Sequence, residues 1–205
     1  EDMVASYFKM RNEQDGKPLL PIQVLNMDDN MNAAFLKSKL DSNSNNIIIG
    51  GSLDETFAGN MAKASYDLHK TYPIQLIGMP NWDNFSALYN KKNLSGLPVY
   101  FTTPFYTDKT NVFSKTLTTA YFNKYKGKPT DMAFKGFESV YLFTKLLTKY
   151  PNSFMSHISD KNLNVFCEYN FRPVKQNDKA SVPDYFENKH LYLIKILNGT
   201  ISRAW

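Results

Sequence analysis

The sequence predicts an α/β fold in which helices flank a mainly parallel sheet and a β-hairpin return closes the chain at the C-terminus. A β-branched run at residues 47–49 ends in Gly50-Gly51, a pattern typical of a buried strand that turns sharply. A helical pattern follows, and Pro73 ends it before the next apolar run. Strand, helix and strand within about thirty residues form a βαβ unit. Ligands of open α/β sheets bind at the carboxyl ends of the strands, so the turn at residues 50–55 is the first candidate site.

The N-terminal half alternates helical and strand patterns. Residues 2–15 and 31–40 carry apolar side chains at helical spacing, and the apolar run at residues 21–25 predicts a strand between them. Ser52 and Glu55 have the spacing of a capping box, which predicts that a third helix begins there. One face of that helix carries Phe57, Met61, Ala64, Leu68 and Tyr72. Alternation of this kind favours a parallel sheet covered by helices.

The C-terminal half begins with a strand and two helices. The expected elements are a strand at residues 99–103, helices at 110–125 and 131–149, and strands at 165–171 and 191–197. Phe113, Leu117, Ala120 and Tyr121 share one face of the first helix, and Phe134, Phe137, Tyr141 and Leu142 lie near one face of the second. Asn198-Gly199 between apolar runs is a strong hairpin signal, so residues 201–205 should pair back.

The composition is that of an ordinary globular protein, with 205 residues, 42% hydrophobic and 21% charged. The net charge of +5 comes from scattered lysines, so we expect no nucleic-acid partner. Cys167 is the single cysteine, which excludes an intramolecular disulfide and a Cys-based zinc site and favours a buried thiol in a strand. The three histidines share no metal-ligand spacing, and no apolar run approaches the ~20 residues that span a bilayer.

The sequence predicts no catalytic residues, no metal and no cofactor. It contains neither a Gly-x-Ser-x-Gly elbow nor the glycine-rich loops that bind nucleotide phosphates. Asp28 and Asp29 are adjacent, so their side chains point apart and are unsuited to shared acid/base work. We therefore expect a protein that is not an enzyme.

Five segments together carry a family resemblance. They are a strand, Gly-Gly turn and acidic residue at 47–55, a strand at 74–80, a crossover at 99–106, an aromatic-rich helix at 134–141 and a closing hairpin at 192–199. Their order resembles the C-terminal half of a type I periplasmic substrate-binding protein of the leucine/isoleucine/valine-binding kind. The resemblance implies an α/β second lobe at residues 1–105, a crossover with first-lobe helices at 106–160, and a β-rich return to the second lobe at 161–205.

The resemblance also implies a set of ligand-binding residues. Ser52, Leu53 and Glu55 lie in the turn that offers groups to the ligand in this family, and an acid at the position of Glu55 can hold a ligand ammonium. The alternative for Ser52 and Glu55 is helix capping alone. Trp82 follows a strand end and could line a cleft or pack in the core. The remaining candidates, Tyr106 and Phe134, would face the hinge, with core packing as the alternative.

The function implied is a non-enzymatic, extracytoplasmic module that binds a small molecule such as an amino acid. The chain starts at Glu1, so we expect it to be part of a longer chain, located in the periplasm or cell envelope. The implied partners are a membrane transporter or a peptidoglycan-linked partner, since some envelope proteins join such a module to a LysM module. The alternative is a cell-envelope interaction or scaffold module that kept the fold without small-molecule binding. An enclosed pocket with convergent donors would favour the binder, and a polar, poorly formed cleft around Ser52 and Trp82 would favour the scaffold.

The helices at residues 110–150 carry one further expectation. In the family they cover the first lobe, so here their apolar face lacks its usual partner. We expect self-association or packing onto the second lobe to bury Phe113, Leu117 and Phe137.

Overall fold

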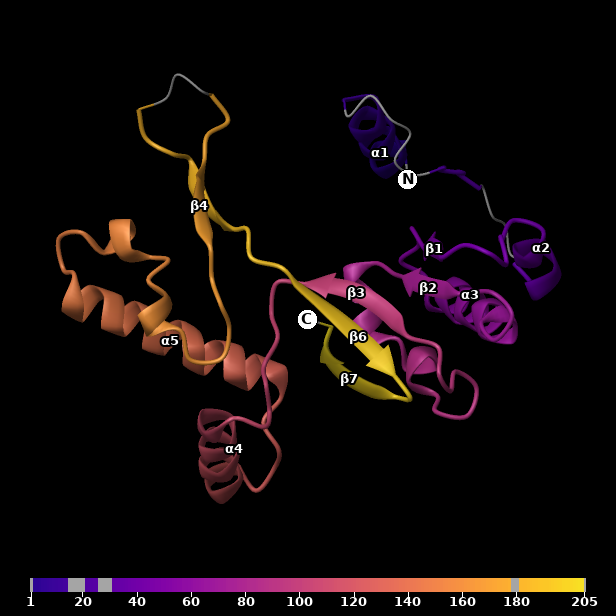
Figure 1. Ribbon diagram of the computed structural model, residues 1–205. Coiled ribbons are helices and arrows are strands. Elements are labelled where there is room, and N and C mark those ends of the chain that lie inside the picture. The colour runs from indigo at the N-terminus through magenta and orange to yellow at the C-terminus, as the bar shows by residue number, and fades with distance from the viewer. Residues whose placement is uncertain (1, 15–20, 26–30, 178–180, 205) are drawn as a thin grey trace. The chain divides into compact units, whose positions relative to one another are not determined.

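The computed structural model of this chain describes residues 2–14, 21–25, 31–177 and 181–204 (Figure 1). The fold is mixed α/β, as the sequence predicts at this coarse level. The chain divides into two compact units. Unit 1 consists of Glu1–Phe101 and Ile194–Trp205, and unit 2 consists of Thr102–Leu193.

The larger sheet has five strands in the order β1-β2-β3-β6-β7. They are β1 (Asn46–Ile49), β2 (Ile74–Ile77), β3 (Val99–Thr103), β6 (Tyr192–Leu197) and β7 (Thr200–Arg203). The first three are parallel, and β6 and β7 form an antiparallel hairpin through the predicted Asn-Gly turn. Both turn residues have positive φ, +51° at Asn198 and +69° at Gly199, which explains this residue pair. The sheet is therefore mixed, with a parallel part that begins at the βαβ unit.

Helices of unit 1 form where the sequence predicts them, with shorter bounds. They are α1 (Asp2–Gln14), α2 (Ala33–Lys37) and α3 (Glu55–Leu68). The unit also contains two 3-10 helices that the sequence analysis did not predict, η1 (Pro80–Asn84) and η2 (Ser86–Tyr89). The helix α3 contacts β2, α2 and η2. Its buried face holds mainly small side chains, Ala58, Met61, Ala62, Ala64 and Ser65, because they let the helix lie close to its neighbours. Met61 and Ala64 belong to the predicted face, whereas Phe57 and Leu68 are only half-buried.

Unit 2 is built on two helices and a small sheet. Its elements are α4 (Val112–Tyr125), α5 (Asp131–Lys149), the 3-10 helices η3 (Phe154–His157) and η4 (Lys161–Leu163), and the antiparallel strands β4 (Phe171–Val174) and β5 (Tyr185–Asn188). A core cluster of buried side chains joins α5 to the segment that follows it: Leu142, Leu146, Ile158, Leu163, Cys167 and Tyr169. Within the described parts of the chain, no helix is both long enough and apolar enough to span a membrane.

Two predicted strands are wrong. Residues 21–25 form no strand, and Val24 is 54% exposed, so this run does not join the sheet. The strand predicted at residues 165–171 begins only at Phe171. Backbone N–H groups of the preceding turn donate instead to the side chain of Glu138, a residue of α5 that is 1% exposed. A carboxylate thus takes the place of a neighbouring strand, and Cys167 is a buried thiol outside any strand.

Apolar side chains remain exposed on the outer faces of α4 and α5. Phe113 is 66% exposed and Phe137 is 45% exposed, while Leu117 is half-buried. The buried residues of α5 follow a spacing of four and are Phe134, Glu138, Leu142 and Leu146. Phe134 and Leu142 of the predicted face are therefore buried, whereas Phe137 and Tyr141 of the same face are exposed. Unit 2 by itself therefore does not bury the face that we expect to be covered, and both self-association and packing onto the second lobe stay predictions.

Candidate functional site

Trp82 is 0% exposed and lies against the carboxyl ends of β1 and β2. A Cβ added to Gly50 would lie 2.6 Å from the indole ring, and one added to Gly78 would lie 2.0 Å from it. Only glycine leaves room for the ring at these two strand ends. Of the two roles considered for Trp82, the structure therefore places it in the core, and its ring occupies the space between the two strand ends.

The turn after β1 is tied down by side chains from the segment after β2. The indole N–H of Trp82 donates to the Ser52 carbonyl at 2.8 Å, and the amide of Asn81 donates to the Leu53 carbonyl at 3.1 Å. Leu53 nevertheless keeps 66% of its side chain exposed. Two hydrogen bonds thus fix the backbone of this turn, while the apolar side chain of Leu53 is exposed.

Asn81 is a site residue that the sequence analysis did not select. Its Nδ2 makes the bond to the Leu53 carbonyl, but its Oδ1 is buried and has no hydrogen-bond partner among the described residues. Buried acceptors without partners are uncommon in folded proteins and cost free energy. The sequence does give one signal that could have identified Asn81. The residue follows the end of a predicted strand, at the edge of the sheet where ligands bind.

The capping box predicted at Ser52 and Glu55 is wrong, because the N-cap of α3 is Asp54. Its side chain accepts the Phe57 N–H at 2.7 Å, and the Ser52 hydroxyl accepts the Asp54 N–H at 3.1 Å. Asp54 is two residues closer to the helix than Ser52, so it reaches the first turn with an ordinary cap geometry. Ser52 shapes the turn and does not cap the helix.

Glu55 instead joins α3 to η2. Its Oε1 accepts the Ser86 hydroxyl at 2.8 Å and the Ala87 N–H at 3.2 Å. The Ser86 hydroxyl, followed by the Ala87 N–H, holds the pKa of the Glu55 carboxyl below its ordinary value of about 4.5. A lowered pKa means that the folded state favours the ionised carboxylate. Its contribution to stability is therefore present above the ordinary pKa and is lost as the pH falls through the lowered pKa.

We expect the substitution Glu55→Gln to lower stability slightly at pH 7, because the amide oxygen can still accept both bonds but carries no charge. The difference from the parent chain should disappear as the pH falls through the lowered pKa of Glu55, below about 4.5, because both side chains are then neutral. Urea unfolding at several pH values measures this. Glu13→Gln, at an exposed position of α1, is the matched control for the change in charge. A difference that persists unchanged below pH 4 would contradict this role.

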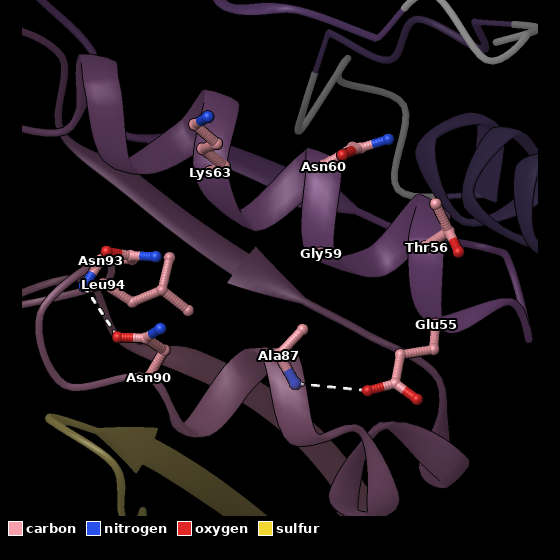
Figure 2. Close-up of a pocket in the computed structure, with 9 residues that line it drawn as sticks. All are labelled: Glu55, Thr56, Gly59, Asn60, Lys63, Ala87, Asn90, Asn93 and Leu94. Carbon is pink, nitrogen blue, oxygen red and sulfur yellow. Dashed lines mark hydrogen bonds between the residues drawn. The ribbon is translucent and has the colours of Figure 1, made fainter.

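A groove of about 430 Å³ runs beside this contact, between α3 and the segment that contains η2 (Figure 2). It is lined by Glu55, Thr56, Gly59, Asn60, Lys63, Ala87, Asn90, Asn93 and Leu94. A Cβ added to Gly59 would lie 3.3 Å from the Ala87 side chain, so this glycine lets the two walls approach each other. Of the predicted site residues, only Glu55 lines the groove.

The polar side chains that line the groove do not point toward a common centre. Figure 2 shows Asn60 and Lys63 extending from α3 away from the wall that carries Ala87 and Asn90. The Asn90 Oδ1 already accepts the N–H groups of Lys92 and Asn93 at 3.1 and 3.2 Å. The groove therefore offers an open polar surface rather than an enclosed pocket with several groups aimed at one point.

The two remaining predicted residues belong to unit 2. Phe134 is 2% exposed and packs edge-on against Phe166, with ring centroids 5.3 Å apart. Tyr106 is half-buried, and its ring lies 5.9 Å from that of Tyr192. Phe134 thus packs in the core, the alternative that the sequence left open, and the prediction of a ligand contact for Tyr106 stays a prediction.

The described residues give little basis for metal or thiol chemistry. In the ranges that the structure covers, no three His, Cys, Asp or Glu side chains lie close enough together to hold a metal ion. Burial, together with the nearby charge of Glu138, raises the pKa of Cys167 to about 12. At neutral pH this residue is therefore a thiol rather than a nucleophilic thiolate.

The structure brings together four of the six predicted residues, Ser52, Leu53, Glu55 and Trp82, through the turn after β1 and its contacts. Most of the polar groups of these residues already form hydrogen bonds within the chain. Asn81 adds an unsatisfied acceptor to this cluster. No protein-family model matches the chain, and a search among curated proteins finds none that is significantly similar to it.

Proposed function

We propose that this chain is a non-enzymatic, extracytoplasmic ligand-binding module of the type I substrate-binding kind, and that it contributes one wall of a site for an amino-acid-like ligand. The observation that carries the proposal is the buried Oδ1 of Asn81 beside the Leu53 turn, which has no hydrogen-bond partner in the described parts of the chain. A ligand ammonium is a strong donor and would satisfy this acceptor. Asn81 follows β2 at the carboxyl edge of the parallel strands, where ligands of α/β sheets bind.

The shape of the turn supports the same function. The hydrogen bonds from Trp82 and Asn81 fix the backbone of Ser52 and Leu53 before any ligand arrives. A fixed wall loses little conformational entropy on binding, so more of the interaction energy appears as affinity. The exposed Leu53 side chain would cover the apolar part of the ligand. In this proposal the partner is a membrane transporter or a peptidoglycan-linked protein, and the location is the periplasm or cell envelope.

A scaffold or interaction module of the cell envelope is the second candidate. It is favoured by the open, polar groove beside Glu55 and by the use of Glu55 as an internal link to η2. The Trp82 ring, which occupies the space between the ends of β1 and β2, favours it as well. Under this alternative the unpaired Asn81 acceptor is only a tolerated cost of folding. The two candidates differ in whether a small amine stabilises the chain.

Calorimetry and thermal shift with glycine, leucine, lysine and putrescine test the proposal. One wall alone leaves the ligand exposed on its other side, so the chain should bind the best of these compounds with a dissociation constant above about 0.1 mM. Asn81→Ala should remove the signal, whereas Asn84→Ala should keep it, because within the described ranges the amide of Asn84 bonds to its neighbour Asp83 and not to the turn.

Two outcomes would decide against this function as stated. No stabilisation by any of the four compounds at millimolar concentration would leave the scaffold candidate. Sub-micromolar binding to residues 1–205 would show that the site is complete in this chain and that the one-wall description is wrong.

A further inference from the structure

A second cavity, of about 560 Å³, lies entirely within unit 2. Its lining combines two cationic side chains, Lys161 and Arg172, with the aromatic rings of Phe171 and Phe186. Glu168 is the one carboxylate in this lining, so positive charge exceeds negative charge around the cavity. Cations beside apolar rings form a surface that suits an anion with an apolar body.

Two nitrogens at this end of the small sheet have no acceptor. His190 lines the cavity, and its Nε2 is buried without a hydrogen-bond partner among the described residues. The Nδ2 of Asn188 is a donor that is likewise buried without a partner among the described residues, but Asn188 does not line the cavity. In the tautomer that carries its proton on Nε2, His190 is a donor that an anion in the cavity would satisfy. In that tautomer the unpaired nitrogen of His190 favours the same sign of ligand charge as Lys161 and Arg172 do.

The walls of this cavity are held by hydrogen bonds that do not depend on a ligand. The Ser159 hydroxyl accepts the Phe171 N–H at 2.8 Å and donates to the Phe171 carbonyl at 3.3 Å. The Oδ1 of Asn188 accepts the N–H groups of Asn170 and His190 at 3.0 and 3.1 Å. The lining is thus fixed at both of its edges, which is how small-molecule sites are usually built.

We propose that this cavity is a binding site for a small organic anion of the aromatic-carboxylate class. The guanidinium of Arg172 matches the planar carboxylate, because two parallel N–H groups can donate to its two oxygens. Lys161 adds a point charge, His190 Nε2 donates in the tautomer that carries its proton there, and the two phenyl rings cover the ligand ring. The site is independent of the Asn81 cluster, since it uses no residue of unit 1.

The test uses ¹⁹F NMR with 4-fluorobenzoate as the probe and the uncharged 4-fluorobenzamide for comparison. We expect saturable binding of the benzoate with a dissociation constant of about 1 mM at low salt, and binding of the amide at least about fivefold weaker. Added salt should weaken the benzoate signal, because the attraction is between charges near the surface. Equal binding of the amide, or no saturation by the benzoate, would overturn the proposal.

Variants identify the residues that bind the probe. Arg172→Gln and Lys161→Gln should each weaken benzoate binding about fivefold, while Lys128→Gln, an equal loss of charge at an exposed position outside the lining, should leave it unchanged. His190→Phe keeps a ring beside Tyr192 but removes the unpaired nitrogen, so it should weaken binding without lowering the melting temperature.

Two simpler explanations are tested as well: that the probe binds elsewhere on the chain, and that the cavity recognises charge alone. If Arg172→Gln and Lys161→Gln bind the probe as the parent chain does, the cavity is not the site. If inorganic phosphate displaces the benzoate at equal concentration, the cavity recognises charge alone and the organic part of the proposal is wrong. Should His190→Phe fail to fold, the arginine and lysine variants still decide the question, because both of their side chains are exposed.

Discussion

Replacing Glu138 with alanine should lower the free energy of unfolding of unit 2 by about 3–5 kcal/mol. The Oε1 of this side chain accepts the N–H groups of Val165, Phe166 and Cys167 at 3.3, 2.7 and 2.8 Å, and its Oε2 accepts the Tyr169 hydroxyl at 3.0 Å. Alanine would leave all of these donors without an acceptor in a region where Glu138 itself is 1% exposed. A buried donor that loses its partner costs more than the bond had contributed.

Glu138→Gln should have a smaller effect, about 1–2 kcal/mol, because the amide oxygen can still accept backbone N–H groups. Its amide nitrogen would have to donate to the Tyr169 hydroxyl, which reverses that bond. Ser139→Ala, at the exposed neighbouring position of α5, is the control and should change little. Urea unfolding gives the order of the three variants.

Hydrogen exchange tests the cause of this effect. The amides of Val165, Phe166 and Cys167 should be protected in the parent chain and exchange rapidly in Glu138→Ala. An alanine variant within about 1 kcal/mol of the parent chain, with these amides still protected, would mean that the carboxylate does not hold the turn together.

Trp82→Ala should destabilise unit 1 by about 3–5 kcal/mol, the range for truncating a large aromatic side chain in a core. Trp82 is 0% exposed, and its loss would also leave the Ser52 carbonyl without the indole donor. Trp82→Phe keeps most of the packing and should cost less. Leu53→Ala is the control in the same turn, because this side chain is 66% exposed.

Gly78→Ala should be as damaging as the loss of the tryptophan itself. The added Cβ would lie 2.0 Å from the Trp82 ring, a distance that no small rearrangement of the flat, enclosed indole can relieve. Denaturant unfolding followed by circular dichroism measures both variants. A fully stable Gly78→Ala variant would show that the ring can move away from the strand end, and the packing described for Trp82 would then be wrong.

The βαβ unit and the two long helices could be predicted from sequence because each depends on a local repeat. Apolar spacing and the stop at Pro73 are enough to locate α3 and β2, and Asn198-Gly199 is enough to locate the final hairpin. The turn at residues 165–167 could not be predicted in this way. Its N–H groups are satisfied by Glu138, which lies 27 residues earlier than Val165, and an alternating apolar run gives no sign of so distant an acceptor.

The candidate site shows the same division between local and distant causes. Ser52 and Glu55 could be found from their position after a strand. The Ser52 hydroxyl bonds to the nearby Asp54, whereas Glu55 bonds to Ser86, which is far away in the chain. The error at Ser52 arose because two possible N-cap residues, Ser52 and Asp54, stand two positions apart and the capping-box spacing favoured the wrong one. Trp82 could not be assigned to the core or to a cleft until the two glycines were placed beneath its ring.

The contact of Trp82 with Gly50 and Gly78 also has a consequence for how the sequence can vary. The Trp82 ring fills the space that a side chain at Gly50 or Gly78 would occupy, so a change at one of these positions limits which residues fit at the other two. In any related chain that keeps these strand ends, we expect the three residues to change together, with a methyl group at the position of Gly78 found only beside a smaller side chain at the position of Trp82. This triplet is therefore a pattern by which distant relatives could be recognised, even where the rest of the sequence has diverged.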